Sequence, residues 1–199
     1  MMRGNLPLIL PHMRIGLFGG SFDPAHQGHL HVSKVALKQL GLHKIIWLIS
    51  PQNPLKAHKP ASIADRLTTA QNLTQHPRIN VSNIESEWNT LFAIDTIHRF
   101  QTLYPNVEFI WIIGSDNWAG FHKWRGWEEI VKTIPIAIYP RPGTTLKAGL
   151  GPAAQRFQQA RRDLSMPNIQ APAWQILGGP YKFEASREMR AKKVAKHLN

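Results

Sequence analysis

The chain has 199 residues, 43% of them hydrophobic, which suits one compact domain and argues against global disorder. It contains no cysteine, which excludes disulfides, thiolate nucleophiles and thiolate metal sites and fits a cytoplasmic location. Twenty-four Lys and Arg against twelve Asp and Glu give a formal net charge of +12, which favours anionic partners such as nucleotides.

The apolar segments of the chain match neither a membrane span nor a signal peptide. No apolar run approaches the roughly 20 residues that a membrane span requires. Residues 1–12 lack the apolar stretch of about 7 residues and the cleavage site of a signal peptide. We therefore expect no membrane partner, a flexible N-terminal extension over residues 1–12, and a single domain over residues 13–199.

Apolar runs and helical patterns alternate along the chain. Strands are predicted at 15–18, 45–49, 78–81, 107–113, 134–139 and 173–177. Helices are predicted at 30–40, 62–74, 94–103, 127–132 and 186–197, and the segment 144–172 reads as a loop with one surface helix. Ser62 and Asp65 have the spacing of a capping box. The alternation predicts an α/β fold, a Rossmann-like open parallel sheet with helices on both faces.

Ligands of such sheets bind beyond the carboxyl ends of the strands, which directs attention to the loop at residues 19–29. Gly19 and Gly20 let backbone N–H groups approach a ligand closely. A helix that begins near Gly28 adds unpaired N–H groups and the positive end of its dipole. His26 and His29 supply further donors, so this loop has the chemistry of a phosphate cradle.

Three other interpretations of this loop fit less well. A dehydrogenase requires G-x-G-x-x-G after its first strand, and the glycines here miss that spacing. A P-loop ends in Gly-Lys-Ser/Thr, which is absent. His26, His29 and His31 could ligate a metal, but no cysteine or nearby carboxylate pair completes a set.

The stretch His26-Gln27-Gly28-His29 resembles the His/Thr-x-Gly-His hallmark of the nucleotidylyltransferase superfamily. The longer pattern Gly-Gly-Ser-Phe-Asp-Pro-x-His-x-Gly-His is similar to the bacterial nicotinate-mononucleotide adenylyltransferases, with Ser21 in place of their usual Thr. The resemblance extends to about residue 195. It implies that ATP is held by Gly19, Gly20, Ser21, Phe22, His26 and His29, with both histidines catalytic.

The resemblance assigns further ATP contacts to later motifs. Lys56 lies where the family carries a basic residue, although an ordinary exposed lysine is an equal alternative. Gly114 and Asp116 match the Gly-x-Asp element that holds the ribose, and Asp116 could also be a helix N-cap. Ser186 and Arg190 match a segment that starts the last helix, with Arg190 catalytic. Arg187 replaces the family's Thr there.

The mononucleotide side matches less closely. By resemblance, Trp124 stacks on the nicotinate ring and backbone N–H groups near Arg125 receive its carboxylate. Phe92 and Ala93 replace the family's Tyr and Thr, so two hydroxyls are lost from this part of the site.

The implied reaction joins ATP and nicotinate mononucleotide to give nicotinate adenine dinucleotide and pyrophosphate, as a step in NAD biosynthesis. Mg²⁺ is expected on the ATP phosphates, with no dedicated protein metal site. Nicotinamide mononucleotide and phosphopantetheine are alternative acceptors. A basic nucleic-acid-binding module is a further alternative, but no clustered Lys/Arg face or RNA-binding motif supports it. The sequence leaves the choice between monomer and homo-oligomer open.

Overall fold

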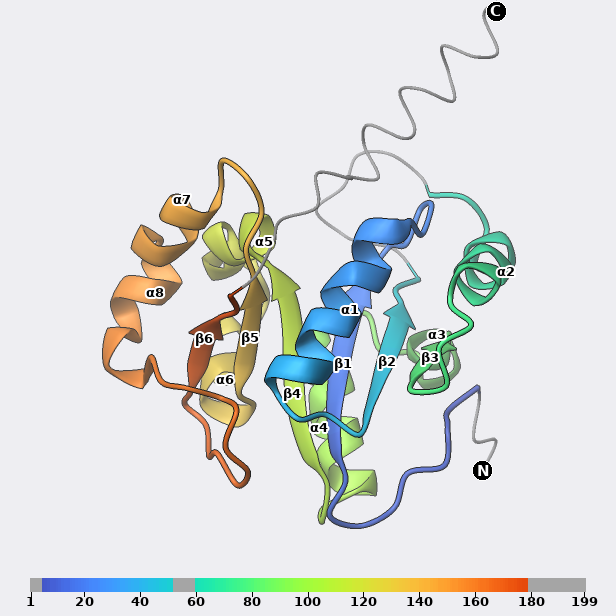
Figure 1. The fold of residues 1–199 in the computed structure, drawn as a ribbon, viewed down its shortest axis with the longest axis horizontal. Helices are drawn as coiled ribbons and strands as arrows, with labels where there is room; N and C mark the ends of the chain where they lie inside the picture. Colours follow the sequence, from blue (N-terminus) through green and yellow to red (C-terminus); the bar gives the residue numbers. More distant parts are fainter. Residues whose placement is uncertain (1–4, 52–59, 179–199) are drawn as a thin grey trace, which may run out of the picture.

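The computed structural model describes residues 5–51 and 60–178, and it confirms the predicted fold class. Six parallel strands form one sheet in the order β3-β2-β1-β4-β5-β6 (Figure 1). The strands are β1 (Arg14–Gly20), β2 (Lys44–Ile49), β3 (Ile79–Ser82), β4 (Glu108–Gly114), β5 (Ile136–Tyr139) and β6 (Trp174–Ile176). Each lies on one of the predicted apolar runs.

Helices cover both faces of the sheet because successive strand residues point to opposite sides. Ile15 and Leu17 of β1 face one apolar cluster, while Phe18 faces the other. The second cluster includes α1 (Gln27–Gln39) and α2 (Ile63–Leu73), and Figure 1 shows α1 in front of the sheet and α4 behind it. Helices that contribute to the first cluster are α3 (Ile84–Trp88), α4 (Ala93–Leu103), α5 (Ser115–Ala119), α6 (Trp127–Thr133), α7 (Thr145–Leu150) and α8 (Pro152–Arg156).

Short elements account for most differences from the predicted pattern. The segment 144–172 contains two helices, α7 and α8, instead of one, because Gly151 ends the first and Pro152 opens the second. Single 3₁₀ turns, η1 (Phe121–Lys123) and η2 (Gln158–Ala160), were also not predicted. The capping of α2 by Ser62 was predicted, and Ser62 Oγ accepts the backbone N–H of Asp65 at 3.1 Å. The helix predicted at 186–197 lies outside the described residues.

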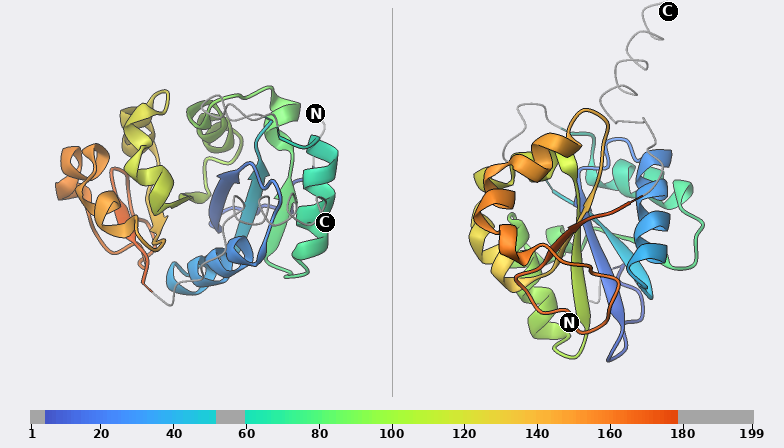
Figure 2. Two further views of the ribbon diagram at one scale, coloured as in Figure 1. Left: turned by 90° about the horizontal axis from the view of Figure 1, so that it is seen from above. Right: turned by 60° about the vertical axis from the view of Figure 1, so that its left-hand side comes forward.

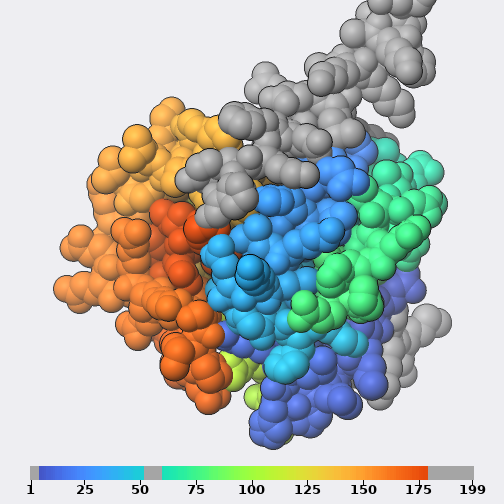
Figure 3. Space-filling model, in the orientation of Figure 1, coloured from blue at the N-terminus to red at the C-terminus, as the bar shows by residue number. Residues whose placement is uncertain are grey.

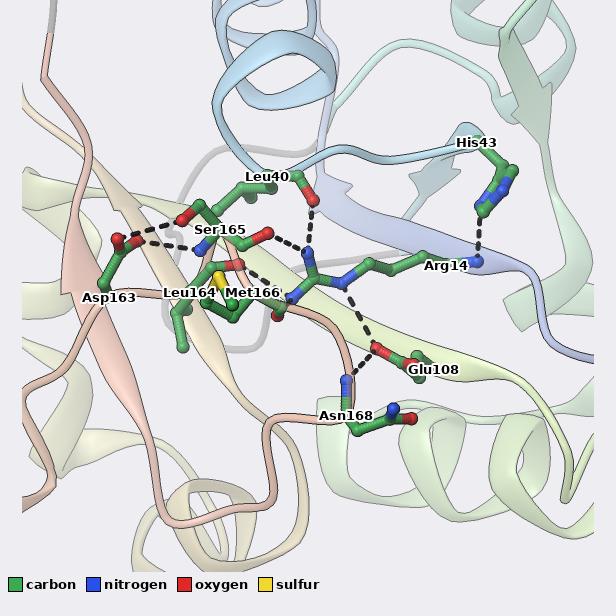
Figure 4. Close-up of polar contacts among 9 residues, drawn as sticks. All are labelled: Arg14, Leu40, His43, Glu108, Asp163, Leu164, Ser165, Met166 and Asn168. Atoms are coloured by element: carbon green, nitrogen blue, oxygen red, sulfur yellow. Dashed lines mark hydrogen bonds and ion pairs between the residues drawn. The ribbon is translucent and has the colours of Figure 1, made fainter.

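Arg14 fastens three parts of the fold at the amino end of β1 (Figure 4). Its guanidinium is buried and donates to four backbone carbonyls, those of Leu40, Leu164, Ser165 and Met166. Its Nε lies 3.3 Å from a carboxylate oxygen of Glu108 in β4. Burial lowers the pKa of Arg14, and Glu108 and Asp163 act in the opposite direction. This arginine therefore joins α1, β4 and the connection to β6.

The outer surface follows from this layering. In Figure 3 the surface of α1 (blue) lies between that of α2 (green) and that of the connection after α8 (orange to red). Figure 2 shows α7 and α8 at the β6 side of the sheet and α2 at the opposite side. Residues Leu6 and Ile9, ahead of β1, pack against the core. Within the described ranges, no helix has the length and apolar character to cross a membrane.

Candidate functional site

The strand order places two loops side by side. The chain passes from β1 to β2 on one side and from β4 to β5 on the other, so the direction of winding changes between β1 and β4. These two strands are paired, with Phe18 opposite Ile112. Ligands of open α/β sheets bind outside the carboxyl ends of the strands at such a point. The loops that follow Phe18 and Ile113, predicted to hold ATP, therefore adjoin one another.

Two glycines lie where the strands lead into these loops, Gly19 near the end of β1 and Gly114 at the end of β4. A Cβ added to Gly19 would lie 2.9 Å from the ring of Trp111 in β4. A Cβ added to Gly114 would lie 2.5 Å from Asp116 Oδ1 and 3.1 Å from Arg141 Nε. A side chain at Gly19 would therefore meet the buried ring of Trp111, and one at Gly114 would displace the side chains of Asp116 and Arg141.

The two histidines of the first loop cap helix α1. His26 is the N-cap residue, and its Nδ1 accepts the backbone N–H of Gly28 at 3.1 Å. His29 Nδ1 accepts the backbone N–H of His26 at 3.2 Å. This is a capping box built from imidazoles, and it starts the helix at Gln27, ahead of the predicted residue 30. Because both Nδ1 atoms accept, the proton of each neutral ring is on Nε2, which makes each Nε2 a hydrogen-bond donor.

Buried aromatic side chains hold these histidines in place. The rings of His26 and His29 have centroids 3.9 Å apart. Phe22 packs 4.7 Å from His29 and stacks on Trp47 at 4.9 Å. Phe22 has a φ of 44°, an unusual value for a bulky residue, and its side chain is 1% exposed. Its side chain therefore packs inside the protein against His29 and Trp47 and does not line the surface of the loop.

A hydrogen-bonded chain orients the first turn of α1 from inside the protein. The indole N–H of Trp47 donates to Ser33 Oγ at 2.8 Å, and Ser33 Oγ donates to the backbone carbonyl of His29 at 2.9 Å. Trp47 and Ser33 are fully buried. The position of His29 is thus fixed by its ring contacts and by its backbone.

The second loop presents a carboxylate beside a guanidinium. Asp116 is exposed and lies in the first turn of α5, 3.4 Å from Arg141 Nη1. The N-cap of α5 is Gly114, so the interpretation of Asp116 as an N-cap is wrong. The backbone N–H of Arg141 donates to Ser115 Oγ at 2.8 Å, which joins the loops after β4 and β5. Arg141 was not predicted, although its place just after β5 is a signal that could have identified it.

The residues predicted for the mononucleotide come together at the start of α4 and of α6. The guanidinium of Arg125 lies 4.5 Å from the centre of the Phe92 ring, a cation–π distance. Ala93 is the first residue of α4, with Phe92 as its N-cap. Trp124 is partly buried and packs 5.1 Å from Phe121. Trp118, left as a core residue by the sequence, is fully buried.

Next to the start of α4 lies a buried carboxyl group that was not predicted from the sequence. Glu85 in α3 is 6% exposed, and its Oε1 lies 3.0 Å from Thr96 Oγ1. Thr96 Oγ1 in turn lies 2.9 Å from Thr90 Oγ1, and the backbone N–H of Thr90 donates to the Glu85 carbonyl. Burial raises the pKa of Glu85 to about 7, and the hydrogen bond from Thr96 partly offsets this. The cluster links α3 to the first turn of α4.

This raised pKa makes stability pH-dependent. Between the ordinary glutamate pKa of 4.5 and the native pKa of about 7, folded Glu85 keeps a proton that the unfolded chain has released, so stability falls as pH rises through this window. Relative to Glu85→Gln, the wild type should lose about 2–3 kcal/mol of unfolding free energy between about pH 5 and pH 8. Urea unfolding at both pH values measures this, with exposed Glu87→Gln as the control; equal losses in wild type and Glu85→Gln would contradict it.

Four residues discussed with this site lie outside the described residues: Lys56, Ser186, Arg187 and Arg190. Among the residues that are described, no group of three or more His, Cys, Asp or Glu side chains is placed to hold a metal ion. The donors of the first loop are imidazoles and backbone N–H groups, which suit phosphate oxygens.

Comparison with known proteins agrees with this geometry. The cytidylyltransferase-like family model matches residues 17–179. A protein of Ruegeria pomeroyi named "Probable nicotinate-nucleotide adenylyltransferase" is 41% identical over 96% of this chain and 91% of its own. One of Caulobacter sp. strain K31 with the same name is 43% identical over 92% of this chain and 99% of its own.

A solved structure supports the fold independently. The nicotinic acid mononucleotide adenylyltransferase of Plasmodium falciparum, complexed with NaAD, superposes with a TM-score of 0.72. The match covers 90% of this chain and 83% of that one at 20% sequence identity, so it bears on the fold alone. The family model and the relatives place the chain in the cytidylyltransferase-like family, among proteins named nicotinate-nucleotide adenylyltransferases.

Proposed function

We propose that this protein transfers the AMP group of ATP to nicotinate mononucleotide, giving nicotinate adenine dinucleotide and pyrophosphate as a step in NAD biosynthesis. The observation that carries the proposal is the imidazole capping box of His26 and His29 at the start of α1. In the proposal, the N-terminus of this helix and the two imidazoles donate to the same anion. The relatives' names and the adjoining loops after β1 and β4 support the same reaction.

The proposed chemistry is an in-line displacement. A phosphate oxygen of the mononucleotide forms a bond to the α-phosphorus of ATP, and the bond from that phosphorus to the bridging oxygen of pyrophosphate breaks. The attacking oxygen is already ionised at neutral pH, so no general base is required. Acceleration then comes from holding the two phosphates in line and from neutralising the charge on the departing pyrophosphate.

The first loop supplies the donors for this charge. In the proposal, His26 and His29 donate through Nε2 to the triphosphate, and the backbone of Gly19 to Phe22 adds N–H groups. Gly114 and Asp116 hold the ribose of ATP. Lys56, Ser186 and Arg190 are proposed on sequence alone as further phosphate contacts. Mg²⁺ would bind to the ATP phosphates and offset part of their negative charge.

The acceptor is proposed to bind at the start of α4 and α6. Trp124 offers an aromatic face for the nicotinate ring, and backbone N–H groups near Ala93 and Arg125 are proposed to receive its carboxylate. The cation–π contact between Phe92 and Arg125 holds these two segments together. In this proposal residues 13–199 act as a single domain in the cytoplasm, where ATP is available.

Product analysis tests the function. Incubation with ATP, Mg²⁺ and nicotinate mononucleotide should yield dinucleotide and pyrophosphate in equal amounts, as measured by chromatography and a coupled phosphate assay. ADP in place of ATP should release no pyrophosphate. Formation of ADP and free phosphate without dinucleotide would instead indicate hydrolysis and would overturn the proposal.

Replacing Trp124 tests the position of the acceptor. Trp124→Ala should raise the KM for nicotinate mononucleotide about tenfold, because a stacked aromatic pair contributes about 0.5–1.5 kcal/mol beyond its buried area. The KM for ATP should change much less. Trp124→Phe keeps an aromatic face and serves as the control. Equal increases in both KM values would argue against stacking on the nicotinate ring.

A further inference from the structure

A second buried arginine, which the sequence did not predict for the site, lies at the opposite end of the sheet from Arg14. Arg66 in α2 is 2% exposed. Its Nε donates to the carbonyl of Ala61 at 2.9 Å, and its Nη1 donates to the carbonyls of Ser21 and Ser50, each at 2.8 Å. Its Nη2 lies 3.3 Å from the carbonyl of Pro51. One side chain thus binds backbone oxygens from three separate segments.

Two of these segments bear on nucleotide binding. Ser21 follows Gly19 and Gly20 in the loop after β1, and Ser50 follows β2. The two strand ends are also joined directly, since the N–H of Ser50 donates to the carbonyl of Gly20 at 3.0 Å. Arg66 therefore fixes the path of the first loop just before it reaches Phe22 and the capping histidine His26.

Arg66 is buried, and burial disfavours the charged form of its guanidinium. Burial lowers its pKa, and the charge of Asp23 acts in the opposite direction. A guanidinium is retained there because it presents five donors in a rigid fork, whereas a lysine ammonium has three donors at one point and reaches fewer separate carbonyls. A buried positive charge beside the first loop also favours an anion in that loop.

We propose that Arg66 is a positioning residue for the triphosphate, acting through the backbone of the loop after β1. It holds the carbonyl of Ser21 inward, so that the N–H groups of this loop and the rings of His26 and His29 keep the geometry in which they bind phosphate. It touches no substrate. The inference rests on the proposed function and adds a residue to the ATP side of that site.

Arg14 provides a matched control for the test. It is also buried and also donates to backbone carbonyls, but at the amino end of β1, away from the nucleotide. Arg66→Lys and Arg14→Lys should both lower the melting temperature. At a temperature at which both variants are fully folded, Arg66→Lys should lower kcat/KM for ATP about 10- to 100-fold, as expected when a reacting group is misplaced. Arg14→Lys should stay within about twofold of wild type.

Direct ATP binding separates this inference from the reaction itself. Calorimetric titration with Mg-ATP alone should give a weaker affinity for Arg66→Lys than for Arg14→Lys, whichever acceptor the enzyme uses. Unchanged ATP affinity and unchanged kcat in folded Arg66→Lys would overturn the role of Arg66. Absence of adenylyl transfer in the wild type, with the difference in ATP affinity intact, would overturn the proposed function only.

A measurement on the wild type covers the case in which Arg66→Lys does not fold. Nitrogen-15 NMR of the arginine side chains should show the Arg66 Nε and Nη resonances shifting when Mg-ATP is added. The Arg14 resonances should not move. If both arginines shift alike, or if neither does, Arg66 has no particular role in holding the nucleotide loop.

Discussion

Replacing His29 with alanine is expected to lower adenylyl transfer by about 10²- to 10³-fold, the usual cost of removing one donor aimed at developing charge. The alanine variant also loses the Nδ1 acceptor that caps α1, which costs about 1 kcal/mol of stability. Both effects are expected of one imidazole, since its Nδ1 accepts the backbone N–H of His26 and its Nε2 is proposed to donate to the triphosphate. Steady-state pyrophosphate release and thermal unfolding measure them separately.

His29→Asn separates the two functions of this ring. The amide oxygen of asparagine takes the place of Nδ1 and can still accept the N–H of His26, while nothing occupies the place of Nε2. Its stability should therefore lie near that of wild type and its turnover near that of His29→Ala. His98→Ala, an exposed histidine in α4, is the control and should behave as wild type. Turnover near normal in His29→Asn would refute the role assigned to Nε2.

Replacing Arg14 with methionine is expected to lower the free energy of unfolding by about 3–5 kcal/mol, the cost of breaking a buried ionic contact by removing one partner. Four backbone carbonyls lose the guanidinium donor at once, and Glu108 loses its ion pair (Figure 4). The site lies at the other end of the strands, so kcat/KM of the folded fraction should change little.

Chemical denaturation measures the loss at Arg14. Arg78→Met is the matched control, because Arg78 is exposed and its guanidinium lies a long 3.4 Å from the carbonyl of Leu42. A loss below about 1 kcal/mol, the usual result for an exposed pair, would show that the contacts of Arg14 add nothing to stability.

The strands were predictable because they are continuous apolar runs, as the burial of both faces of a parallel sheet requires. The sequence placed the start of α1 near Gly28 but not its capping by His26, since histidine is not among the usual N-cap residues and only the fold reveals that its Nδ1 accepts a backbone N–H. The single surface helix predicted in 144–172 became two because Gly151 and Pro152 interrupt it.

The site, too, has parts that could be predicted from the sequence and parts that could not. Its loops could be located from the sequence, because the rule for open parallel sheets points to the carboxyl ends of the strands. The buried groups could not. Arg66 and Glu85 gain their surroundings from residues distant in the chain, such as Ser21 for Arg66 and Thr96 for Glu85. A lone charged residue in a helical pattern carries no sign of such partners, and its ordinary interpretation is a solvated face.

The most direct test of the account compares three acceptors in parallel: nicotinate mononucleotide, nicotinamide mononucleotide and phosphopantetheine, each with Mg-ATP and pyrophosphate release as the readout. The highest kcat/KM is expected with nicotinate mononucleotide, and that activity should be lost in His29→Asn. A higher kcat/KM with either of the other acceptors, or undiminished activity in His29→Asn, would contradict it.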